Sequence, residues 1–306
     1  MLAFVLRRIV GTFAVLLTVS IFVFAFVRLL PGDPARLVAG PDATLEDVEA
    51  VRAEMGLQGS LVRQYGHWLI QTLKGDLGKS AKTGQPVASE IGQRFLPTLW
   101  LTLVAMGWST LAGLLIGVVS GVKRGKWQDQ TVMALAVSGV SFPSFWLGLL
   151  LIDLFAVRLG LLPTGGYEDW RSFILPSITL GAGVAAVLAR FTRSAYVEVA
   201  AEDYVRTARA KGVPEWSVIL KHTLRNALIP VVTLIGLEFG FLLGGSIVVE
   251  TVFSWPGLGR LLIDSVSFRD YPVLQAEILL FSTEFVLINL VVDLLYAVVN
   301  PEIRLT

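Results

Sequence analysis

Long apolar runs alternate with shorter polar segments along the 306 residues of the chain, and six of the runs are long enough to cross a membrane. A helix of about 20 residues spans the roughly 30 Å of hydrocarbon in a bilayer. The predicted spans are residues 9–30, 97–122, 131–157, 174–191, 227–250 and 274–299. The first run is too long for the core of a signal peptide, and no small-residue cleavage site follows it, so we predict a retained first span.

The composition supports an integral membrane protein. Hydrophobic residues make up 54% of the chain and charged residues only 16%, whereas soluble domains carry about 25% charged residues. The sequence contains no cysteine, which excludes disulfides, thiol chemistry and cysteine-based metal sites.

The basic residues indicate how the spans are oriented. Arg7 and Arg8 precede the first span, and residues 123–126 place three further cations between the second and third spans. A third group surrounds the segment after the fourth span and comprises Arg190, Arg193, Arg206, Arg209, Lys211, Lys221 and Arg225. Because cytoplasmic loops carry an excess of Lys and Arg, we predict that both termini and the segment after the fourth span are cytoplasmic. Residues 300–306 then form a cytoplasmic tail.

Residues 31–95 carry charges of both signs and predict a small domain outside the cytoplasm, called here the N-terminal polar domain. Thr44 and Asp47 have the spacing of a capping box, so a helix is expected to begin there and to end at Gly56. Its predicted buried side consists of Val48, Val51 and Met55. A second helix is predicted over residues 61–73. With about 65 residues, the domain can build only a modest core of its own.

The polar segment at about 194–226, between the fourth and fifth spans, is much longer than an ordinary connection needs. Tyr196, Ala200, Tyr204 and Ala208 recur every four residues, which predicts that they share one side of a helix. Gly212 is expected to end this helix, and Pro214 suits the first turn of a second helix with Glu215 near its N-terminus. The pattern predicts a helix-turn-helix on which a partner protein docks. The alternative is an amphipathic helix lying on the inner membrane surface.

Residues 75–80 imitate a phosphate-binding loop, but the required glycine five positions before Gly78 is replaced by Leu73. No strand precedes the segment, so we predict a loop with glycine turns and no ATP site. His67 and His222 are the only histidines, and the predicted topology places them on opposite sides of the membrane. A histidine-based metal site or proton relay is therefore excluded.

Five acidic residues fall within predicted spans, where ionisable groups are costly and usually functional. They are Asp153, Glu238, Glu277, Glu284 and Asp293. Glu277 and Glu284 are seven residues apart and share one side of a helix, and Glu238 is placed to face them from the fifth span. Two interpretations stay open. The carboxylates line a watery translocation pathway and hold a peptide's amino group, or they have structural roles. In the second interpretation Asp153 and Asp293 pair with Arg158 or Arg190, or they sit near a membrane interface.

Intramembrane carboxylates also suit two other classes of protein. A proton-coupled secondary transporter would use them to carry protons, but the chain contains no convincing inverted repeat. An aspartic-type intramembrane protease would use a pair such as Asp153 and Asp293, but neither residue has an accompanying motif. Both alternatives leave the segment at 194–226 unexplained.

Several segments spread over nearly the whole chain carry a resemblance to a known family. They are LPGDP at 30–34, GDLG at 75–78, residues 202–212, LRNA at 224–227, ETVFSWPGLG at 250–259 and NP at 300–301. Together they resemble the permease subunits of ATP-binding-cassette (ABC) importers for peptides. The resemblance is to the dipeptide/oligopeptide branch, and within it the permeases of glutathione importers are the most similar.

The resemblance implies an all-α polytopic membrane protein with the type I ABC importer fold. The first span, residues 1–30, and the polar domain at 31–95 would precede a five-helix permease core at 96–299. In this family the segment after the fourth span is a coupling helix that docks on a separate ATPase. The family's Glu-Ala-Ala-x₃-Gly signature is matched at Ala208 and Gly212. The implied coupling residues are Glu202, Asp203, Arg206, Thr207, Ala208, Lys211, Gly212 and Pro214.

The resemblance also implies partners and a mechanism. The chain would pair with a second homologous permease, two ATPase subunits and a periplasmic substrate-binding protein in the bacterial inner membrane. It would have no catalytic residues and no cofactor, because ATP and Mg²⁺ belong to the ATPase subunits, and no nucleic-acid partner. Small peptides, glutathione among them, would pass from periplasm to cytoplasm by alternating access, along a pathway that includes Glu238, Glu277 and Glu284.

Overall fold

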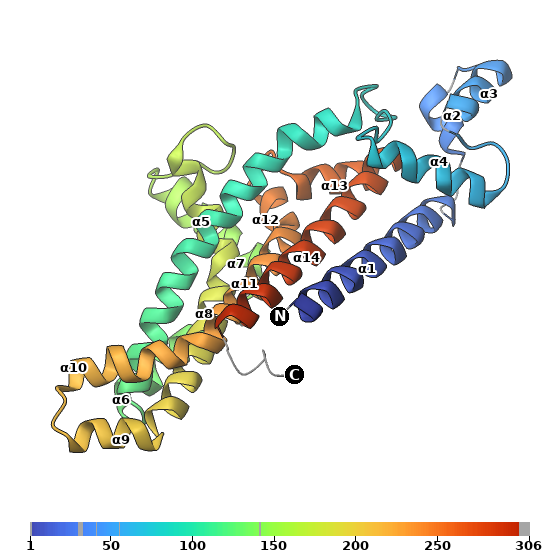
Figure 1. Cartoon of the computed structure of the whole chain (residues 1–306). Helices are drawn as coiled ribbons and strands as arrows, with labels where there is room; N and C mark the ends of the chain where they lie inside the picture. Colours follow the sequence, from blue (N-terminus) through green and yellow to red (C-terminus); the bar gives the residue numbers. More distant parts are fainter. Residues whose placement is uncertain (1, 30–32, 41, 55, 141, 300–306) are drawn as a thin grey trace. The chain divides into compact units, whose positions relative to one another are not determined.

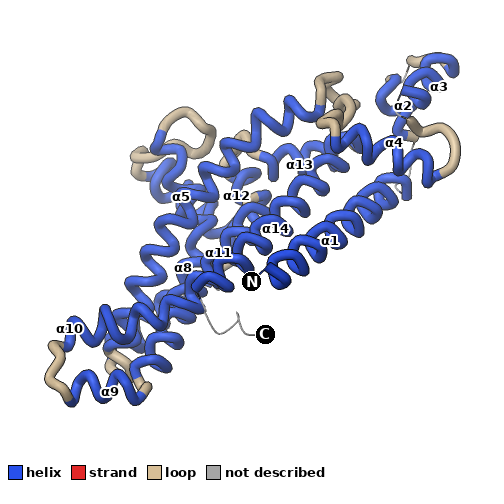
Figure 2. Tube along the Cα trace, in the orientation of Figure 1, coloured by secondary structure: helices blue, strands red, loops and turns tan. Residues whose placement is uncertain are grey.

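The structure is a computed structural model that describes residues 2–29, 33–40, 42–54, 56–140 and 142–299. Within these residues the regular structure is helical, apart from one isolated bridge between Lys79 and Pro86 (Figures 1 and 2). The predicted all-α class is confirmed.

The helices divide into an N-terminal and a C-terminal series. The N-terminal series is α1 (Leu2–Leu29), α2 (Pro34–Ala39), α3 (Leu45–Glu54), α4 (Leu61–Leu73), α5 (Val87–Val122), α6 (Trp127–Val140), α7 (Ser144–Leu151) and η1 (Ile152–Arg158). The C-terminal series is η2 (Trp170–Phe173), α8 (Ile174–Ala200), α9 (Asp203–Ala210), α10 (Glu215–Ser217), η3 (Val218–Leu224), α11 (Arg225–Gly245), α12 (Ile247–Val252), α13 (Leu258–Phe268) and α14 (Tyr271–Val299).

Among the residues that the structure describes, four helical stretches are long and apolar enough to cross a membrane. They are Val5–Leu29, Val87–Val122, Trp170–Ala200 and Glu215–Gly245. The predicted sixth span lies on α14, whereas the predicted third span is divided between α6, α7 and η1. Pro143 caps the start of α7 and has no amide hydrogen to donate into a continuous helix. The total of six spans stays a prediction.

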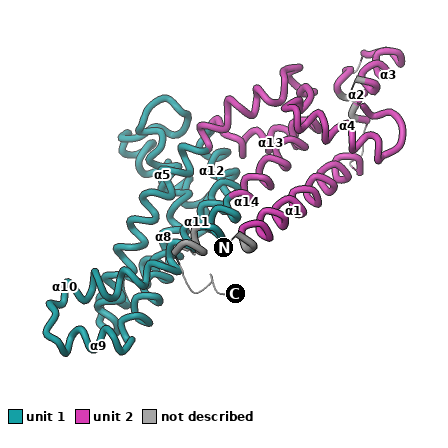
Figure 3. The backbone as a smooth tube through the Cα atoms, viewed as in Figure 1, with its two compact units in different colours: residues 1, 99–255, 288–306 teal, residues 2–98, 256–287 magenta. Residues whose placement is uncertain are grey.

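The chain divides into two compact units (Figure 3). Unit 1 contains residues 99–255 and 288–306, and unit 2 contains residues 2–98 and 256–287. The long helices α5 and α14 therefore contribute to both units. The predicted domain boundaries at residues 30, 95 and 299 were drawn between segments of different predicted roles and not between compact units, and they stay a prediction.

The core of unit 1 is built around α8, whose side chains Leu175 and Leu188 are fully buried. The segment at 250–259 contributes Trp255, which is also fully buried and stacks edge-on against Tyr167 and Phe173. These aromatic contacts give part of that distinctive segment a packing role.

Three glycines spaced four apart on α5 face α8 at very short range. A Cβ atom added at Gly113 would lie 2.6 Å from the Cβ of Leu188, and one at Gly117 would lie 2.6 Å from the carbonyl oxygen of Ala189. At Gly121 the added atom would lie 2.7 Å from the ring of Tyr196. Small residues at this spacing let two helices approach closely inside a membrane. This stripe was not predicted from the sequence.

Unit 2 contains the N-terminal polar domain, where the predicted local signals are confirmed. The carboxylate of Asp47 accepts hydrogen bonds from the amide (3.0 Å) and hydroxyl (2.7 Å) of Thr44, at the start of α3. Gly56 has a φ of +63° after the helix. The predicted helix 61–73 is α4, with the same bounds. Of the predicted buried side of α3, Val48 is buried and Val51 half-buried; Met55 lies outside the described residues.

Candidate functional site: a coupling hairpin, a buried brace and pathway carboxylates

The segment between α8 and α11 forms a helical hairpin, called here the 201–226 hairpin. Helix α8 ends at Ala200, and α9 begins at Asp203 after a two-residue turn. The prediction that Tyr196, Ala200, Tyr204 and Ala208 share one helix is therefore wrong. Glu202 has extended backbone angles (φ −64°, ψ 147°) and caps a new helix. A spacing of four residues persists across such a turn, so the spacing alone cannot reveal the break.

The turn between the two arms of the hairpin follows the prediction closely. Gly212 has a φ of +77°, the left-handed region that glycine adopts readily, after α9 has ended at Ala210. Pro214 was expected inside the first turn of the second helix, but it is the capping residue just before it, with φ −61° and ψ 140°. The helix itself begins at Glu215. The Glu215 carboxylate forms an ion pair with Arg209 across the turn, with 3.0 Å between a guanidinium nitrogen and a carboxylate oxygen.

The two arms of the hairpin close on a small apolar cluster. Val205 and Val218 are fully buried, Ala208 is 7% exposed, and Val213 packs against them. Near the open end, the amide nitrogen of Asn226 donates to the hydroxyl of Tyr204 at 2.7 Å. The apolar side of α9 is therefore occupied within the hairpin, and Ala208 does not belong to a surface that a partner can reach.

The other predicted coupling residues remain on the surface. Glu202, Asp203, Arg206, Thr207, Lys211, Gly212 and Pro214 are all exposed. Arg206 forms an ion pair with Asp203 one turn away on α9. A surface-exposed pair of this kind contributes little to stability, so both side chains are available to a partner. The surface that the hairpin offers is mainly polar and charged, and it also exposes Trp216 and Leu220.

A buried ion pair lies just before the hairpin. Arg193, on the last part of α8, binds Asp129 of α6 through two nitrogens, each 2.7 Å from a carboxylate oxygen. Asp129 is 2% exposed and also accepts hydrogen bonds from the Ser120 hydroxyl and, at 2.9 Å, from the Gly125 amide. The hydrogen bond from Arg193, followed by that from Ser120, holds the pKa of Asp129 well below its usual range.

This brace joins α8 to the turn between α5 and α6. From the sequence, Arg193 was only a marker of membrane orientation, and Asp129 was not predicted as a site residue. The two residues are 64 positions apart, and no local pattern connects them. A two-nitrogen contact between Arg and a carboxylate also fixes orientation, so the end of α8 is held in one position within unit 1.

The predicted pathway carboxylates occupy two units. Glu277 and Glu284 lie on α14 in unit 2; Glu277 is fully buried, and Glu284 is half-buried. Neither carboxylate oxygen of Glu284 accepts a hydrogen bond from the described residues. Glu238 is half-buried on α11 in unit 1, and the expectation that it faces the other two stays a prediction. Asp153 pairs with Arg158 at 2.7 Å, which confirms the structural interpretation for that residue.

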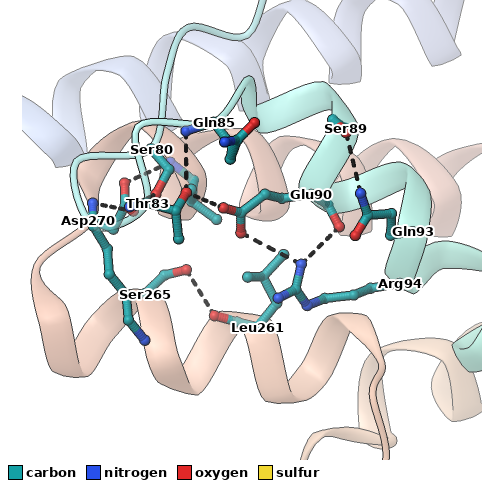
Figure 4. A network of polar contacts seen from close by, with 12 residues as sticks. Ser80, Thr83, Gln85, Ser89, Glu90, Gln93, Arg94, Leu261, Ser265 and Asp270 are labelled. Atoms are coloured by element: carbon teal, nitrogen blue, oxygen red, sulfur yellow. Dashed lines mark hydrogen bonds and ion pairs between the residues drawn. The ribbon is translucent and has the colours of Figure 1, made fainter.

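Residues 75–86 form the predicted loop, with left-handed glycines at Gly75 and Gly78 (φ +84° and +83°). Asp270, 3% exposed, accepts hydrogen bonds from the hydroxyl of Ser80 and from the amides of Ala81 (3.1 Å) and Lys82 (3.2 Å) (Figure 4). This set of contacts is called here the Asp270 clamp. It fixes the loop to the connection between α13 and α14 within unit 2.

The clamp continues into α5. The hydroxyl of Thr83 donates to Glu90, and Glu90 pairs with Arg94 at 3.4 Å one turn further along the helix (Figure 4). The start of α5 is thus tied to the same loop. From the sequence this stretch was recognisable only as a false phosphate-binding motif, because its partner Asp270 is 190 positions away.

Comparison with known proteins places these features in one family. Residues 113–305 match the family described as the binding-protein-dependent transport system inner membrane component, and residues 1–102 match its N-terminal part. The glutathione transport system permease protein GsiC of Escherichia coli O6:H1 is 60% identical over 304 residues, covering 99% of both chains. GsiC of Salmonella choleraesuis is also 60% identical over 304 residues.

Solved structures support the fold. A crystal structure of the inward-facing MetNI methionine ABC transporter superposes with a TM-score of 0.60 at 22% identity, covering 69% of this chain and 96% of that one. An amino acid ABC transporter superposes with a TM-score of 0.54 at 19% identity, covering 68% and 93%. At such low identity the likeness concerns the fold alone, and that fold is the one predicted for a type I ABC importer.

The all-helical fold and its helical hairpin define the class: a membrane permease of an ABC importer. The chain belongs to the family of binding-protein-dependent transport system inner membrane components. Such a permease is a transport component and not an enzyme, and it works with ATPase and substrate-binding partners. The alternatives of a secondary transporter and an intramembrane protease are therefore not favoured.

Proposed function

We propose that this chain is the permease of a bacterial inner-membrane importer that moves glutathione and related short peptides from periplasm to cytoplasm. The observation that carries the proposal is the 60% identity to GsiC proteins over 99% of both chains. In this proposal the chain pairs with a second homologous permease, and both of its termini are cytoplasmic. The partner ATPases bind ATP and Mg²⁺, and a periplasmic binding protein delivers the cargo.

The 201–226 hairpin is the proposed docking element for an ATPase subunit. Val205, Ala208 and Val218 are buried between its own arms, and its exposed surface combines charged side chains with the apolar Trp216 and Leu220. An element of this kind keeps its shape without its partner and can transmit a rigid-body movement. The brace between Asp129 and Arg193 holds the helix that enters the hairpin, so movement of the hairpin is passed to α8.

The carboxylates of α14 are the proposed contacts for cargo within the membrane. Glu284 is half-buried and accepts no hydrogen bond from the described residues. A buried carboxylate without a donor is costly, and a peptide's amino group would remove that cost during passage. Glu277 lies seven residues earlier on the same side of the helix, and Glu238 is the proposed contact from α11.

Transport by the complete importer tests the proposal. The two permeases, the ATPases and the binding protein would be reconstituted in proteoliposomes with ATP inside, and uptake of tritiated glutathione would be followed. We expect ATP-dependent uptake that stops without the binding protein. The double variant Glu277→Gln, Glu284→Gln should lower uptake at least tenfold while basal ATPase activity persists, and Asp153→Asn is the matched control. Uptake of other solutes but not of peptides would contradict the proposed cargo.

A further inference from the structure

A cavity of about 390 Å³ lies within unit 2, beside the loop that the Asp270 clamp holds. Its walls come from the end of α1, from α4, from the loop after α4 and from the start of α14. Trp68, Leu77 and Pro272 supply apolar surface, and a small number of polar side chains share the lining. Volume and lining are those of a small-molecule site, since such sites are apolar cavities of about 300–1,000 Å³ with a few polar groups.

One polar group in the lining is a buried donor that has no partner among the described residues. Gln275, near the start of α14, is 7% exposed, and its amide nitrogen makes no hydrogen bond to any described residue. Buried amides are nearly always hydrogen-bonded, because an unpaired one loses its contact with water and gains nothing. A rotation of the Gln275 side chain that turns this amide toward the cavity would let an acceptor oxygen there satisfy the donor.

A cation lines the same cavity. Arg28 lies in the last turn of α1, with its guanidinium carbon 3.7 Å from the centre of the Phe24 ring and its Nε atom 3.3 Å from the amide oxygen of Gln64. Phe24 and Gln64 thus support the side chain on two sides. No carboxylate among the described residues pairs with Arg28. Its terminal nitrogens are therefore available to an anion that enters the cavity.

The lining combines several polar groups with a single carboxylate. Arg28 is a donor, the side chains of Gln71, Gln275, His67 and Tyr271 can both donate and accept, and Asp76 is the one carboxylate in the lining that the structure describes. One oxygen of Asp76 accepts from the amide of Gly78 at 3.0 Å, which leaves the other for a cationic group. A cation, Arg28, and a single carboxylate, Asp76, both line an otherwise partly apolar cavity, which suits a molecule that carries both charges and a short apolar body.

We propose that this cavity is a cargo subsite that binds a carboxylate of a short peptide between Arg28 and Gln275. The inference rests on the proposed peptide cargo, and it adds a stopping point before the membrane. The proposed topology puts the end of α1 and the N-terminal polar domain on the periplasmic side, where the binding protein releases its cargo. Carboxylate recognition in the cavity and amino-group recognition at Glu277 and Glu284 would then act on opposite ends of one peptide.

Equilibrium binding to the complete permease–ATPase complex tests the subsite. The complex would be placed in phosphatidylcholine nanodiscs without nucleotide or binding protein, and the affinities of tritiated glutathione and trialanine would be measured. Arg28→Gln and Gln275→Met should each weaken binding at least tenfold. Arg36→Gln, which removes an exposed cation of the same unit outside the cavity, should change binding less than twofold. Trialanine amide, which lacks the carboxylate, should bind at least tenfold more weakly than trialanine.

A second measurement separates binding from folding. Because the amide of Gln275 has no partner among the described residues, Gln275→Met should leave the melting temperature of the complex unchanged or raise it. A lowered melting temperature together with weakened binding would mean that Gln275 has a structural role, and the subsite would be rejected. Equal peptide affinity in the wild type and both variants would also overturn it.

The remaining outcomes separate a peptide subsite from a lipid site and from a failure of the transport cycle. Phosphatidylglycerol in the nanodiscs should leave peptide affinity unchanged; loss of peptide binding in that lipid would assign the cavity to a lipid phosphate and overturn the proposal. Absence of saturable binding of both peptides would overturn it as well. Failure of ATP-driven uptake alongside intact, Arg28-dependent binding would overturn the proposed function and not the subsite.

Discussion

The 201–226 hairpin and the Asp270 clamp both fix a polar connection between long helices, but they do so by opposite means. The hairpin closes on Val205, Ala208 and Val218, all within fourteen positions of the chain. The clamp closes on hydrogen bonds that a loop donates to one buried carboxylate, Asp270, which lies 190 positions from Ser80 in the chain. During folding, apolar contacts within one short segment can form early and without the rest of the protein. The hydrogen bonds of the clamp can form only once the distant segments of unit 2 have come together.

The two regions also differ in the surface that they expose. The hairpin buries Val205, Ala208 and Val218 and exposes charged residues together with Trp216 and Leu220, so a partner can dock on it without changing its internal packing. In the clamp the charged group itself is the buried part, and Asp270 is 3% exposed. We therefore expect changes in the clamp to act through folding of unit 2, and changes on the hairpin surface to act through partner binding.

The largest expected effect comes from the brace that supports the hairpin. Asp129→Asn leaves Arg193 without its carboxylate and should lower the free energy of unfolding by about 3–4 kcal/mol. Since the folded pKa of Asp129 is depressed, the stability it provides is present above the unfolded value of about 3.9 and is lost as pH falls through the lower folded pKa. The difference in melting temperature between the wild type and the variant should therefore be largest near pH 7 and should disappear only in strong acid. A constant difference down to pH 2 would contradict the role of the ionised carboxylate.

The next effect tests apolar closure of the hairpin. Ala208→Glu places a carboxylate among Val205, Val213 and Val218 and should cost about 2–3 kcal/mol locally by overpacking and by burying a charge. We expect the ATPase subunits to be lost on purification, although the spans still insert. Thr251→Glu adds the same charge at an exposed position of α12, in the same unit but outside the hairpin, and should retain them. If the two variants behave alike, the hairpin is not closed by these apolar residues.

The corresponding change in the clamp is Asp270→Ala, which leaves the Ser80 hydroxyl and the amides of Ala81 and Lys82 without their acceptor. We expect a loss of about 2 kcal/mol in the free energy of unfolding, because buried donors lose their hydrogen bonds. Asp264→Ala, on α13 in the same unit, is the control. Hydrogen exchange should rise at residues 80–83 and not in the hairpin. Increased exchange in both regions would show that the clamp and the hairpin are not independent.

The smallest effect concerns the turn of the hairpin. Gly212→Val puts a β-branched residue at a φ of +77° and should cost about 1–2 kcal/mol. The space around Gly212 is open, so the cost is one of backbone conformation and not of collision. ATPase activity should persist while uptake falls, because the turn sets the angle of the hairpin. Gly160→Val, at φ +61° in the loop after η1 and also in open space, is the matched backbone control, and equal loss of uptake there would remove the special role of Gly212.

Local signals in the sequence were sufficient where the structure is local. Thr44, Asp47 and Gly56 bracket α3 as expected, and Gly212 marks the turn of the hairpin, because capping and left-handed glycines depend on a few neighbouring residues. The break at Ala201 and Glu202 was missed, since the same four-residue spacing continues through it. Asp129, Asp270 and Gln275 were missed because their environments are made by distant segments, and no pattern around them reveals those partners.

The glycine stripe on α5 has a consequence for how the sequence can diverge. At Gly113, Gly117 and Gly121 even a methyl group would collide with α8, so these positions admit no substitution unless α8 shifts in compensation. Gly107, on the same helix, has no atom within 4 Å of an added Cβ, and alanine there would strengthen the helix by about 1 kcal/mol. Glycines on the same helix therefore differ in their tolerance of substitution. Gly113, Gly117 and Gly121 are tightly constrained, whereas replacing Gly107 by alanine would stabilise the helix.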